Sequence, residues 1–502
     1  MRENPAARAL SIATRHPRLG AVLGSDRVAP LALRHGDTAA AHRFARAYRL
    51  LQQGMLCDDL DETVSALLQR ADHHLERGRE NLAVEWADMA CLLAFHHTTN
   101  TLRTPAFIRD PDAFHRDLLG TRAGRLLFSQ PDAPVPDRSR EFPEATAERP
   151  RRVLILSQGL WTFAHRVRDL LEADPCIEVR TMDLGDLPVG DRLNHRRTLR
   201  ARWAYSLHGT VQEVPQELVE PLEWADEVFL EWGSFWSAWM TLLDLRRFNV
   251  RLTLRIHRFE LFTPYAMTIR MAAVDRVVFV SDFLERMGYQ LIPRLPQTGG
   301  TQVVSNAHDF SPFAPAQQEG DEFVLAQVGW APPIKDVVFT LEVLEALREH
   351  DSRYRLLLIG PEPATDPRDW KHHDKVMALR ERLGDAVEVL GFRDDVPELL
   401  GRAGFLMSSS LIESAHEAVP EGASAGAVPV VRNWPFAAPW NGARSLYPDE
   451  WVVEDVAGAV ARILAHRDPQ VRQQAGLEAR AWVQRNRCHG DDEKGFSALL
   501  RR

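Results

Sequence analysis

Two glutamates lie eight positions apart in the stretch "SSSLIESAHEAVPEGASAGAVPVV" (408–431). Glu413 follows the strand-like run "GFLMSSS" (404–410), and Glu421 follows Pro420, which fits the first turn of a helix. Carboxylates accept hydrogen bonds from neighbouring hydroxyl groups, so a pair at the end of a strand suits a sugar and a ribose. Because acidic residues are also common near helix starts, solvated surface charge is the alternative interpretation.

Strand-like and helix-like segments alternate from residue 151 onward, which predicts parallel sheets with helices on both faces. The alternation restarts after a hinge-like stretch at 311–322, so we expect two doubly wound α/β domains. Such folds bind ligands beyond the carboxyl ends of their strands, and both glutamates are therefore expected to line a cleft. The predicted strands are 151–157, 226–232, 251–257, 276–281, 301–307, 323–329, 354–360, 386–391, 404–410 and 427–433.

The first part of the chain has a helical pattern. Apolar residues recur at steps of three and four within 64–75 and 82–93, on either side of Gly78, which predicts a helical hairpin for packing or partner binding. Asp59 and Asp61 resemble a metal–nucleotide motif, but acidic residues that open a helix explain them better. The predicted divisions are a helical accessory domain (1–128), a proline-rich linker (129–150), a first (151–312) and a second (313–485) Rossmann-like domain, and a tail (486–502).

The second α/β block resembles the retaining family 4 glycosyltransferases of GT-B fold. Their signature, Glu-x7-Glu before a small-residue helix and a Gly-x-Pro-Val-Val strand, has its counterpart in Glu413-x7-Glu421 and "GASAGAVPVV". The segment "QVGWAPPIKDVVFTLEVLEAL" (327–347) resembles the part of the family that carries a phosphate-binding lysine, here Lys335. "LRIHRFE" and "VVSNAHDFSPF" of the first block are also similar. The resemblance covers roughly residues 151–485 and implies a GT-B fold preceded by an all-α domain.

The resemblance also implies an activity, the transfer of a sugar from a nucleotide-diphosphate-sugar donor to an unknown acceptor, with retention. Lys335 would pair with the diphosphate and stabilise the charge that grows on it. Glu413 would contact the transferred sugar, His257 would lie near that sugar, and Glu421 would hold the ribose. The other predicted site residues are Gly329, Ser414, His416 and Glu417 around the donor, with Gly391 and Arg393 beside the base.

Two departures from the family pattern bear on this interpretation. Trp330 stands where the family usually has a basic residue, so one diphosphate cation is missing or comes from Arg258, Arg393 or Arg432. The tripeptide "SAH" (414–416) replaces a usual Gly-Phe-Gly, which leaves the donor sugar open. The alternative functions are a non-catalytic GT-B scaffold that binds a partner through its helical domain, and a sugar-nucleotide epimerase.

The composition is that of an ordinary globular protein, with 45% hydrophobic and 26% charged residues and a net charge of −9. This charge argues against bulk nucleic-acid binding, and no nucleic-acid partner is expected. No apolar run approaches the ~20 residues of a membrane span. Four cysteines without metal-ligand spacing fit a reducing cytoplasm. Neither α/β block has an Asp-x-Asp at a suitable loop, so we expect no cofactor and no required metal.

Five arginines are concentrated in "RLNHRRTLRAR" (192–202). A solvated helix face is one interpretation, and contact with anionic lipid headgroups or a lipid-diphosphate acceptor is the other. The acceptor is therefore open among glycans, lipid-linked molecules and proteins, and the expected location is the cytoplasm, with or without contact to the inner membrane face. Trp232, Trp236 and Trp239 are predicted to pack between domains rather than to stack on a sugar.

Overall fold

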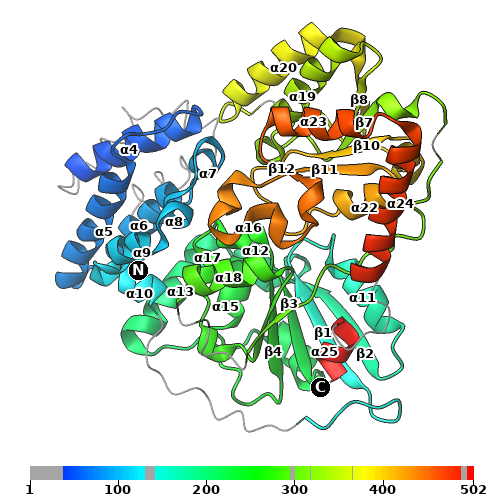
Figure 1. The fold of residues 1–502 in the computed structure, drawn as a ribbon. Helices are drawn as coiled ribbons and strands as arrows, with labels where there is room; N and C mark the ends of the chain where they lie inside the picture. Colours follow the sequence, from blue (N-terminus) through cyan, green and yellow to red (C-terminus); the bar gives the residue numbers. More distant parts are fainter. Residues whose placement is uncertain are drawn as a thin grey trace.

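Two parallel sheets lie one above the other, and a helical domain flanks them (Figure 1). The computed structural model describes residues 38–129, 142–293, 295, 300–316, 318–363, 366–487 and 495–501. Each sheet is covered by helices on both faces, as in Rossmann-like domains. The predicted fold class is confirmed: two doubly wound domains in a GT-B arrangement, preceded by helices.

The first sheet has the strand order β2-β1-β3-β4-β5-β6, and all of its strand pairs are parallel. Its interior strands are buried on both faces, which explains their continuous apolar runs. The strands are β1 (Arg151–Ser157), β2 (Ile177–Asp183), β3 (Glu227–Glu231), β4 (Arg251–Ile256), β5 (Arg276–Phe279) and β6 (Thr301–Val303). The helices are α11 (Ala164–Glu172), α12 (Pro188–Arg192), α13 (His195–His208), α14 (Gln216–Trp224), α15 (Phe235–Met240), α16 (Arg258–Leu261), α17 (Tyr265–Thr268) and α18 (Asp282–Leu291).

The second sheet has the order β12-β11-β10-β7-β8-β9 and is also parallel. Every predicted strand is present, although β6 and β10 are shorter than predicted, and β2 and β12 were not predicted. The strands are β7 (Val324–Val328), β8 (Arg355–Ile359), β9 (Val387–Gly391), β10 (Phe405–Ser408), β11 (Val428–Arg432) and β12 (Val452–Val453). The α-helices are α19 (Val337–His350), α20 (Trp370–Leu383), α21 (Val396–Gly401), α22 (Ala418–Ser424), α23 (Val456–Ala465) and α24 (Pro469–Asn486).

The helical domain contains the predicted hairpin. Helices α5 and α6 pack against each other, and Gly78 turns between them with a φ of +66°. Asp59 is the N-cap residue of α5, but its carboxylate pairs with Arg46 at 3.1 Å instead of capping the helix. The helices are α4 (Thr38–Gln52), α5 (Leu60–Glu76), α6 (Glu80–Ala94), α7 (His97–Leu102), α8 (Ala106–Arg109), α9 (Pro111–Leu119) and α10 (Arg122–Phe128).

The chain returns to the first α/β domain at its end. Helix α24 leads from the second domain towards the first, and α25 (Phe496–Arg501) packs beside β1 and β2 (Figure 1). Phe496 and Leu500 are buried in the same apolar cluster as Val153 of β1. The Arg151 guanidinium donates to the carbonyl oxygen of Leu500 at 3.2 Å. The segment 486–502, expected as a tail, therefore supplies a helix to the core of the first domain.

Helix α13 carries the arginine-rich sequence, and it lies against the helical domain. Arg202 is fully buried and donates to the carbonyl oxygen of Leu127 at 3.1 Å. Arg196 forms an ion pair with Glu85, and Arg200 lies 3.4 Å from the same carboxylate. The interpretation as a solvated helix face is therefore wrong for Arg196 and Arg202, because these side chains join the helical domain to the first sheet.

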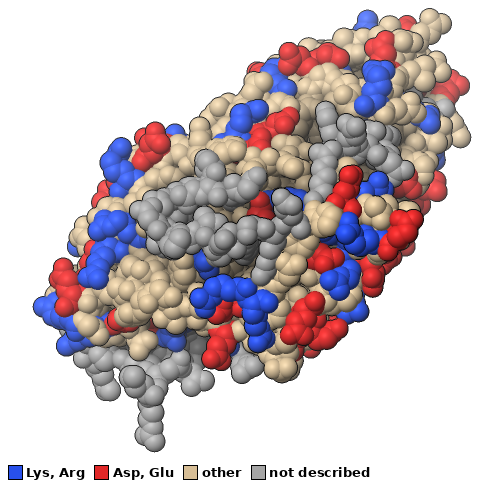
Figure 2. Space-filling model, turned by 90° about the horizontal axis from the view of Figure 1, so that it is seen from below, with Lys and Arg blue, Asp and Glu red and all other residues tan. Residues whose placement is uncertain are grey.

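The described surface mixes charges of both signs. Figure 2 shows a face on which basic and acidic side chains are interspersed over the described residues. Within the described ranges, no helix is both long and apolar enough to cross a bilayer. The thiols of Cys57, Cys91 and Cys176 are free, and Cys488 lies outside the described residues.

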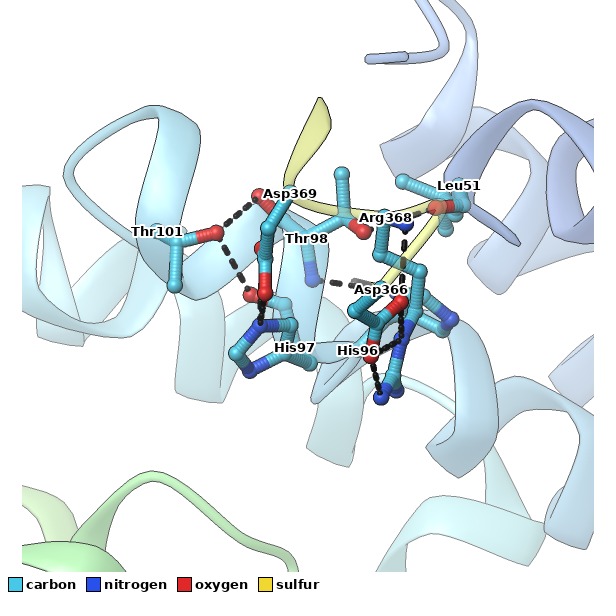
Figure 3. A network of polar contacts seen from close by, with 8 residues as sticks. All are labelled: Leu51, His96, His97, Thr98, Thr101, Asp366, Arg368 and Asp369. Carbon is cyan, nitrogen blue, oxygen red and sulfur yellow. Dashed lines mark hydrogen bonds and ion pairs between the residues drawn. The ribbon is translucent and has the colours of Figure 1, made fainter. Parts of the chain in front are cut away.

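The helical domain also contacts the second α/β domain, at the segment that leads into α20 (Figure 3). His97 Nε2 lies 3.1 Å from Asp369 Oδ1, and the Trp370 indole donates to the carbonyl oxygen of Gln53 at 3.0 Å. Gly54 approaches this segment so closely that a Cβ atom there would lie 2.4 Å from the carbonyl oxygen of Arg368. The contact therefore depends on the absence of a side chain at position 54.

Substitution of Gly54 tests this contact. Gly54 and Gly78 both have a φ near +65°, but a Cβ at Gly78 would meet nothing within 4 Å. Gly78→Ala should cost about 1 kcal/mol of stability from backbone strain alone. Gly54→Ala should cost roughly 2–3 kcal/mol, because the new methyl group also pushes the segment at Arg368 away. Thermal unfolding of both variants measures the difference, and equal melting temperatures would contradict the close contact.

Candidate functional site

The carboxyl ends of the two sheets meet at the loop that follows β10. The backbone N–H of Arg258, just after β4, donates to Ser414 Oγ at 3.0 Å. Ser281, just after β5, donates its hydroxyl to the carbonyl oxygen of Ser414 at 2.9 Å. Asn306, beyond β6, donates its amide to Glu417 Oε1 at 2.8 Å. The loop 409–417 thus occupies the position where paired Rossmann-like domains hold their ligands.

The structure brings Lys335 and Glu413 together, although 78 positions separate them. Lys335 Nζ lies 2.6 Å from Glu413 Oε1, and the Ser410 hydroxyl donates to the same oxygen at 2.6 Å. Burial alone would raise the pKa of Glu413, but the charges of Lys335 and Arg258 outweigh burial and lower this pKa to about 2. Glu413 is therefore ionised near neutral pH and is held beside an ammonium group at the meeting of the two domains.

The loop that carries Lys335 is fixed to the loop after β10. It ends in a short 3₁₀ turn, η5 (Pro333–Lys335), and the backbone N–H of Leu411 donates to the carbonyl oxygen of Ile334 at 2.8 Å. The Ser409 hydroxyl donates to the carbonyl oxygen of Lys335 at 2.7 Å. These hydrogen bonds fix the two loops relative to each other, although they come from different parts of the chain. The direction of the lysine side chain is set in this way.

Asp336, the next residue, has an unusual backbone conformation. Its φ of +41° lies in the left-handed region, which costs about 1 kcal/mol or more for a residue other than glycine. Its carboxylate pairs with Arg432 at 2.6 Å, and Arg432 also donates to the carbonyl oxygen of Ser409 at 3.3 Å. The ion pair holds the strained residue in place at the N-cap position of α19, which begins at Val337.

Glu421 lies in the first turn of α22, as predicted, but it faces the first domain rather than Lys335. Its Oε1 atom lies 3.0 Å from Nε2 of His308, whose other ring nitrogen contacts Arg166. Burial raises the pKa of Glu421, and the charge of Arg166 opposes this rise. Gly422 explains how α22 comes so close to the sheet, because a Cβ there would lie 2.8 Å from the Leu406 side chain.

The residues between the two glutamates hold the loop together. Glu417 pairs with Arg487 at 2.8 Å in addition to its bond from Asn306. His416 is buried, and its Nδ1 atom lies 2.6 Å from Ser408 Oγ. Burial, with the charge of Lys335, lowers the pKa of His416 to about 3, so its ring is neutral. These two side chains are therefore bonded to protein groups instead of lying free for a ligand.

His257 belongs to a buried network of the first domain. Its Nε2 atom lies 2.7 Å from Oε1 of Glu231, and the Trp232 ring stacks on it with 4.1 Å between centroids. Trp232 has a φ of +73° and donates its indole N–H to the carbonyl oxygen of Leu160 at 2.9 Å. Trp236 and Trp239 instead pack in the apolar core that continues into the second domain, as predicted for packing residues.

The other predicted donor residues lie at the ends of neighbouring strands. Gly329 follows β7 with a φ of +70°, and its N–H donates to the carbonyl oxygen of Ile359 at 2.9 Å. The carbonyl oxygen of Gly391, at the end of β9, accepts from Gly360 at 2.8 Å. Arg393 pairs with Asp395, and among the described residues no contact brings it to Lys335 or Glu413.

One of the three arginines considered as a substitute cation lies near Glu413. Trp330 is fully buried in the second domain and does not reach the pair. Arg432 forms an ion pair with Asp336, and Arg393 forms one with Asp395. Burial lowers the pKa of Arg258, and the carboxylates of Glu413 and Glu260 oppose this shift. Arg258 is therefore within electrostatic range of Glu413, from the opposite domain.

Sequence reasoning missed four side chains at this site, namely Ser410, Asn306, His308 and Arg166. Ser410 was part of the quoted run "GFLMSSS", and Asn306 and His308 belong to "VVSNAHDFSPF". These polar residues follow apolar strand-like runs directly, and this position could have marked them as candidate site residues. Arg166 lies within α11, and nothing in its sequence context marks it.

Comparisons with known proteins show what parts of the chain are similar to. Residues 322–466 match a family described as "Glycosyl transferases group 1". No curated protein matches the chain. Among solved structures, HepE from Anabaena, in complex with UDP and glucose, has a TM-score of 0.49 and 14% identity over 70% of this chain and 96% of that one. Sucrose-phosphate synthase from Thermosynechococcus elongatus has a TM-score of 0.49 and 16% identity over the same shares. The segment that matches this family lies in the second α/β domain and contains Lys335, Glu413 and Glu421.

Proposed function

We propose that the protein transfers a sugar from a nucleotide-diphosphate-sugar donor to a hydroxyl group of an acceptor. The observation that carries this proposal is the Lys335–Glu413 pair, at 2.6 Å, where the carboxyl ends of both sheets meet. The match of residues 322–466 to a glycosyltransferase family supports it, because this segment contains both residues. Retention of anomeric configuration, membership of family 4 and independence of a metal are parts of the same proposal.

The transfer exchanges one bond for another. The bond between the anomeric carbon and the diphosphate oxygen breaks, and the acceptor oxygen forms the new bond to that carbon. The hydroxyl proton leaves to the diphosphate or to solvent. Negative charge grows on the departing diphosphate, and a fixed ammonium group stabilises this charge where water is largely excluded. In this proposal Lys335 supplies the ammonium group, and Arg258 is the second cation from the opposite wall.

The carboxylates have separate tasks in this proposal. Glu413 accepts hydrogen bonds from hydroxyl groups of the transferred sugar, since it stays ionised throughout the working pH range. Glu421 accepts from the ribose, and Gly329, Gly391 and Arg393 border the nucleotide. His257 acts through its network with Glu231 at the sugar side. Donor binding would require Lys335 to turn from Glu413 towards the diphosphate.

A non-catalytic scaffold is the second candidate. The observation that favours it is that Glu417 and Glu421 already bond to Arg487 and His308, while Trp330 is buried in place of a cation. A protein of this kind would keep the fold and the loop geometry without binding a donor. Donor binding therefore separates the two candidates.

A screen of nucleotide sugars tests the proposed activity. The purified full chain should show a raised melting temperature with at least one of UDP-, GDP- or ADP-linked hexoses, because a ligand that binds only the folded form stabilises it. Calorimetry with the same compound should give a dissociation constant, and addition of EDTA should leave it unchanged. Absence of binding for every compound would reject glycosyl transfer in favour of the scaffold.

Replacement of Lys335 tests its role in the reaction. Lys335→Ala should lower transfer, or hydrolysis of the donor, by roughly 100- to 1000-fold, the usual effect of losing one group that stabilises transition-state charge. Lys375→Ala is the matched control, because Lys375 also pairs with a glutamate, Glu342 at 2.8 Å, but lies on the exposed face of α20. Equal activity of the two variants would show that Lys335 does not meet the leaving group.

The charge state of Glu413 predicts a pH dependence of stability. Its pKa of about 2 in the folded protein lies below the ordinary 4.5, so its ionised form stabilises the fold above pH 4.5. This contribution, at most on the order of 3 kcal/mol, is lost as the pH falls from 4.5 towards 2. The melting temperature of the wild type should therefore fall more steeply over this range than that of Glu413→Gln. Parallel curves would contradict the pairing with Lys335.

A further inference from the structure

A cavity of about 570 Å³ lies where the helical domain and both α/β domains meet. Helices α4, α6 and α7 form one wall, α16 and α17 with the loop between them form the second, and Ile334 and Arg368 of the second α/β domain form the third. Its size is that of pockets that enclose a small molecule. The helical domain is thus part of a binding cavity and not only an appendage to the fold.

The side chains that line the cavity combine aromatic rings with neutral polar groups. Phe259 is 51% exposed, although it is apolar and lies between domains. Tyr48 of α4 and Tyr265 of α17 also line the cavity, together with Gln52 and Thr101 from the helical wall. Aromatic rings stack on the C–H faces of sugar rings, while amides and hydroxyls hydrogen-bond to sugar hydroxyls. This combination suits a polyhydroxyl ring better than an alkyl chain.

The charges around the cavity favour a neutral occupant. Arg368 is already paired with Asp366, with 3.0 Å between Nε and the carboxylate. Burial, with the charge of Arg368, lowers the pKa of His96 to about 3, so this ring on the helical wall is uncharged. His97 on the same wall faces Asp369 at 3.1 Å, and the guanidinium of Arg258 on the first-domain wall is near the carboxylates of Glu413 and Glu260. These cationic groups of the lining already face carboxylates, which suits a neutral sugar better than a phosphate group.

The helical wall is held at a fixed distance from the donor side. Figure 3 shows His97 and Asp369 facing each other across the junction, with Thr98 and Arg368 beside them. Thr98 donates its hydroxyl to the carbonyl oxygen of Leu51 at 2.7 Å, which ties α7 to α4. Together with the bond from Trp370 to Gln53, these contacts fix the wall to the second domain. The cavity is therefore preformed.

The cavity borders the candidate site directly. Ile334 precedes Lys335, and the N–H of Arg258 donates to Ser414 in the loop that carries Glu413. The guanidinium of Arg258 stands between the cavity and Glu413, over the ring of Phe262 at 5.4 Å. A molecule that fills the cavity would present its end to the Lys335–Glu413 pair. The cavity is thus next to both loops of the Lys335–Glu413 pair.

We propose that this cavity binds the acceptor, that the acceptor is a neutral carbohydrate, and that the helical domain selects it through Tyr48, Gln52 and Thr101. The inference rests on the proposed glycosyl transfer, since it names the acceptor of that reaction. A hydroxyl of the bound sugar supplies the oxygen for the new glycosidic bond, and its proton leaves as described above.

Binding of simple glycosides to the full chain tests this inference. Saturation-transfer NMR with methyl α- and β-glycosides of glucose, galactose, mannose and N-acetylglucosamine should show binding of at least one. Phe259→Ala should weaken that binding about tenfold or more through loss of stacking. Thr101→Val, which keeps the shape of the side chain and removes one hydroxyl, should weaken it about three- to tenfold. Tyr289→Ala is the control, because Tyr289 is an aromatic residue of the same domain, 45% exposed and outside the cavity lining.

The outcomes separate this inference from the proposed reaction. Binding that both cavity variants weaken and the control keeps supports the inference, provided that all three variants melt at the wild-type temperature. If Phe259→Ala alone has a lower melting temperature than the wild type, the inference is judged by the binding that Thr101→Val retains. Binding that neither variant changes, binding of octanol in place of the glycosides, or no glycoside binding overturns the inference. In these cases the reaction stands if a nucleotide sugar binds. If no nucleotide sugar binds, the reaction is rejected whatever the NMR result.

Discussion

The ion pair between Lys335 and Glu413 is the interaction on which the rest of the site depends. A carboxylate with 11% of its side chain exposed is stable only when hydrogen bonds and an opposite charge compensate for lost water. The ammonium of Lys335 and the hydroxyl of Ser410 supply this compensation. Both loops must therefore keep their relative position, and the bonds from Ser409 and Leu411, with the Asp336–Arg432 pair, maintain it. The same contacts hold the strained backbone of Asp336 in place.

The first domain contributes to the site through backbone and neutral groups at its strand ends and through the guanidinium of Arg258. The N–H of Arg258 and the hydroxyl of Ser281 both bond to Ser414, so β4 and β5 hold one residue of the opposite domain. Polar contacts of this kind can open and re-form more easily than a packed apolar interface. The apolar core that runs through both domains opposes a wide separation. The geometry is that of two domains that are joined but can adjust to a ligand at their boundary.

The sequence predicted the interior strands and a common cleft for Lys335, Glu413 and Glu421, but not the direct contact between Lys335 and Glu413. Physical reasons limit what else it could predict. Interior strands such as β3 and β4 are buried on both faces and appear as apolar runs, whereas β2 alternates with exposed residues and β12 has two residues. Lys335 and Glu413 were joined through a family pattern and not through spacing. The contact of His257 with Glu231 depends on which strands are neighbours, because Glu231 ends β3 and His257 follows β4. Arginines of α13 that were expected to be exposed instead contact the helical domain. The sequence of one helix does not reveal which other element packs on it.

The helical domain changes how such a pair of domains can move. It is joined to the first α/β domain through the buried Arg202 of α13 and to the second through His97 and Trp370. A closing motion that brings the two sheets together must therefore break one of these contacts or carry the helical domain with it. The second contact includes a close backbone approach at Gly54, which tolerates little sliding. Because the cavity lies between these two attachments, its walls keep their position relative to the loop that carries Lys335. The entropy lost in ordering the site when a ligand binds is therefore small.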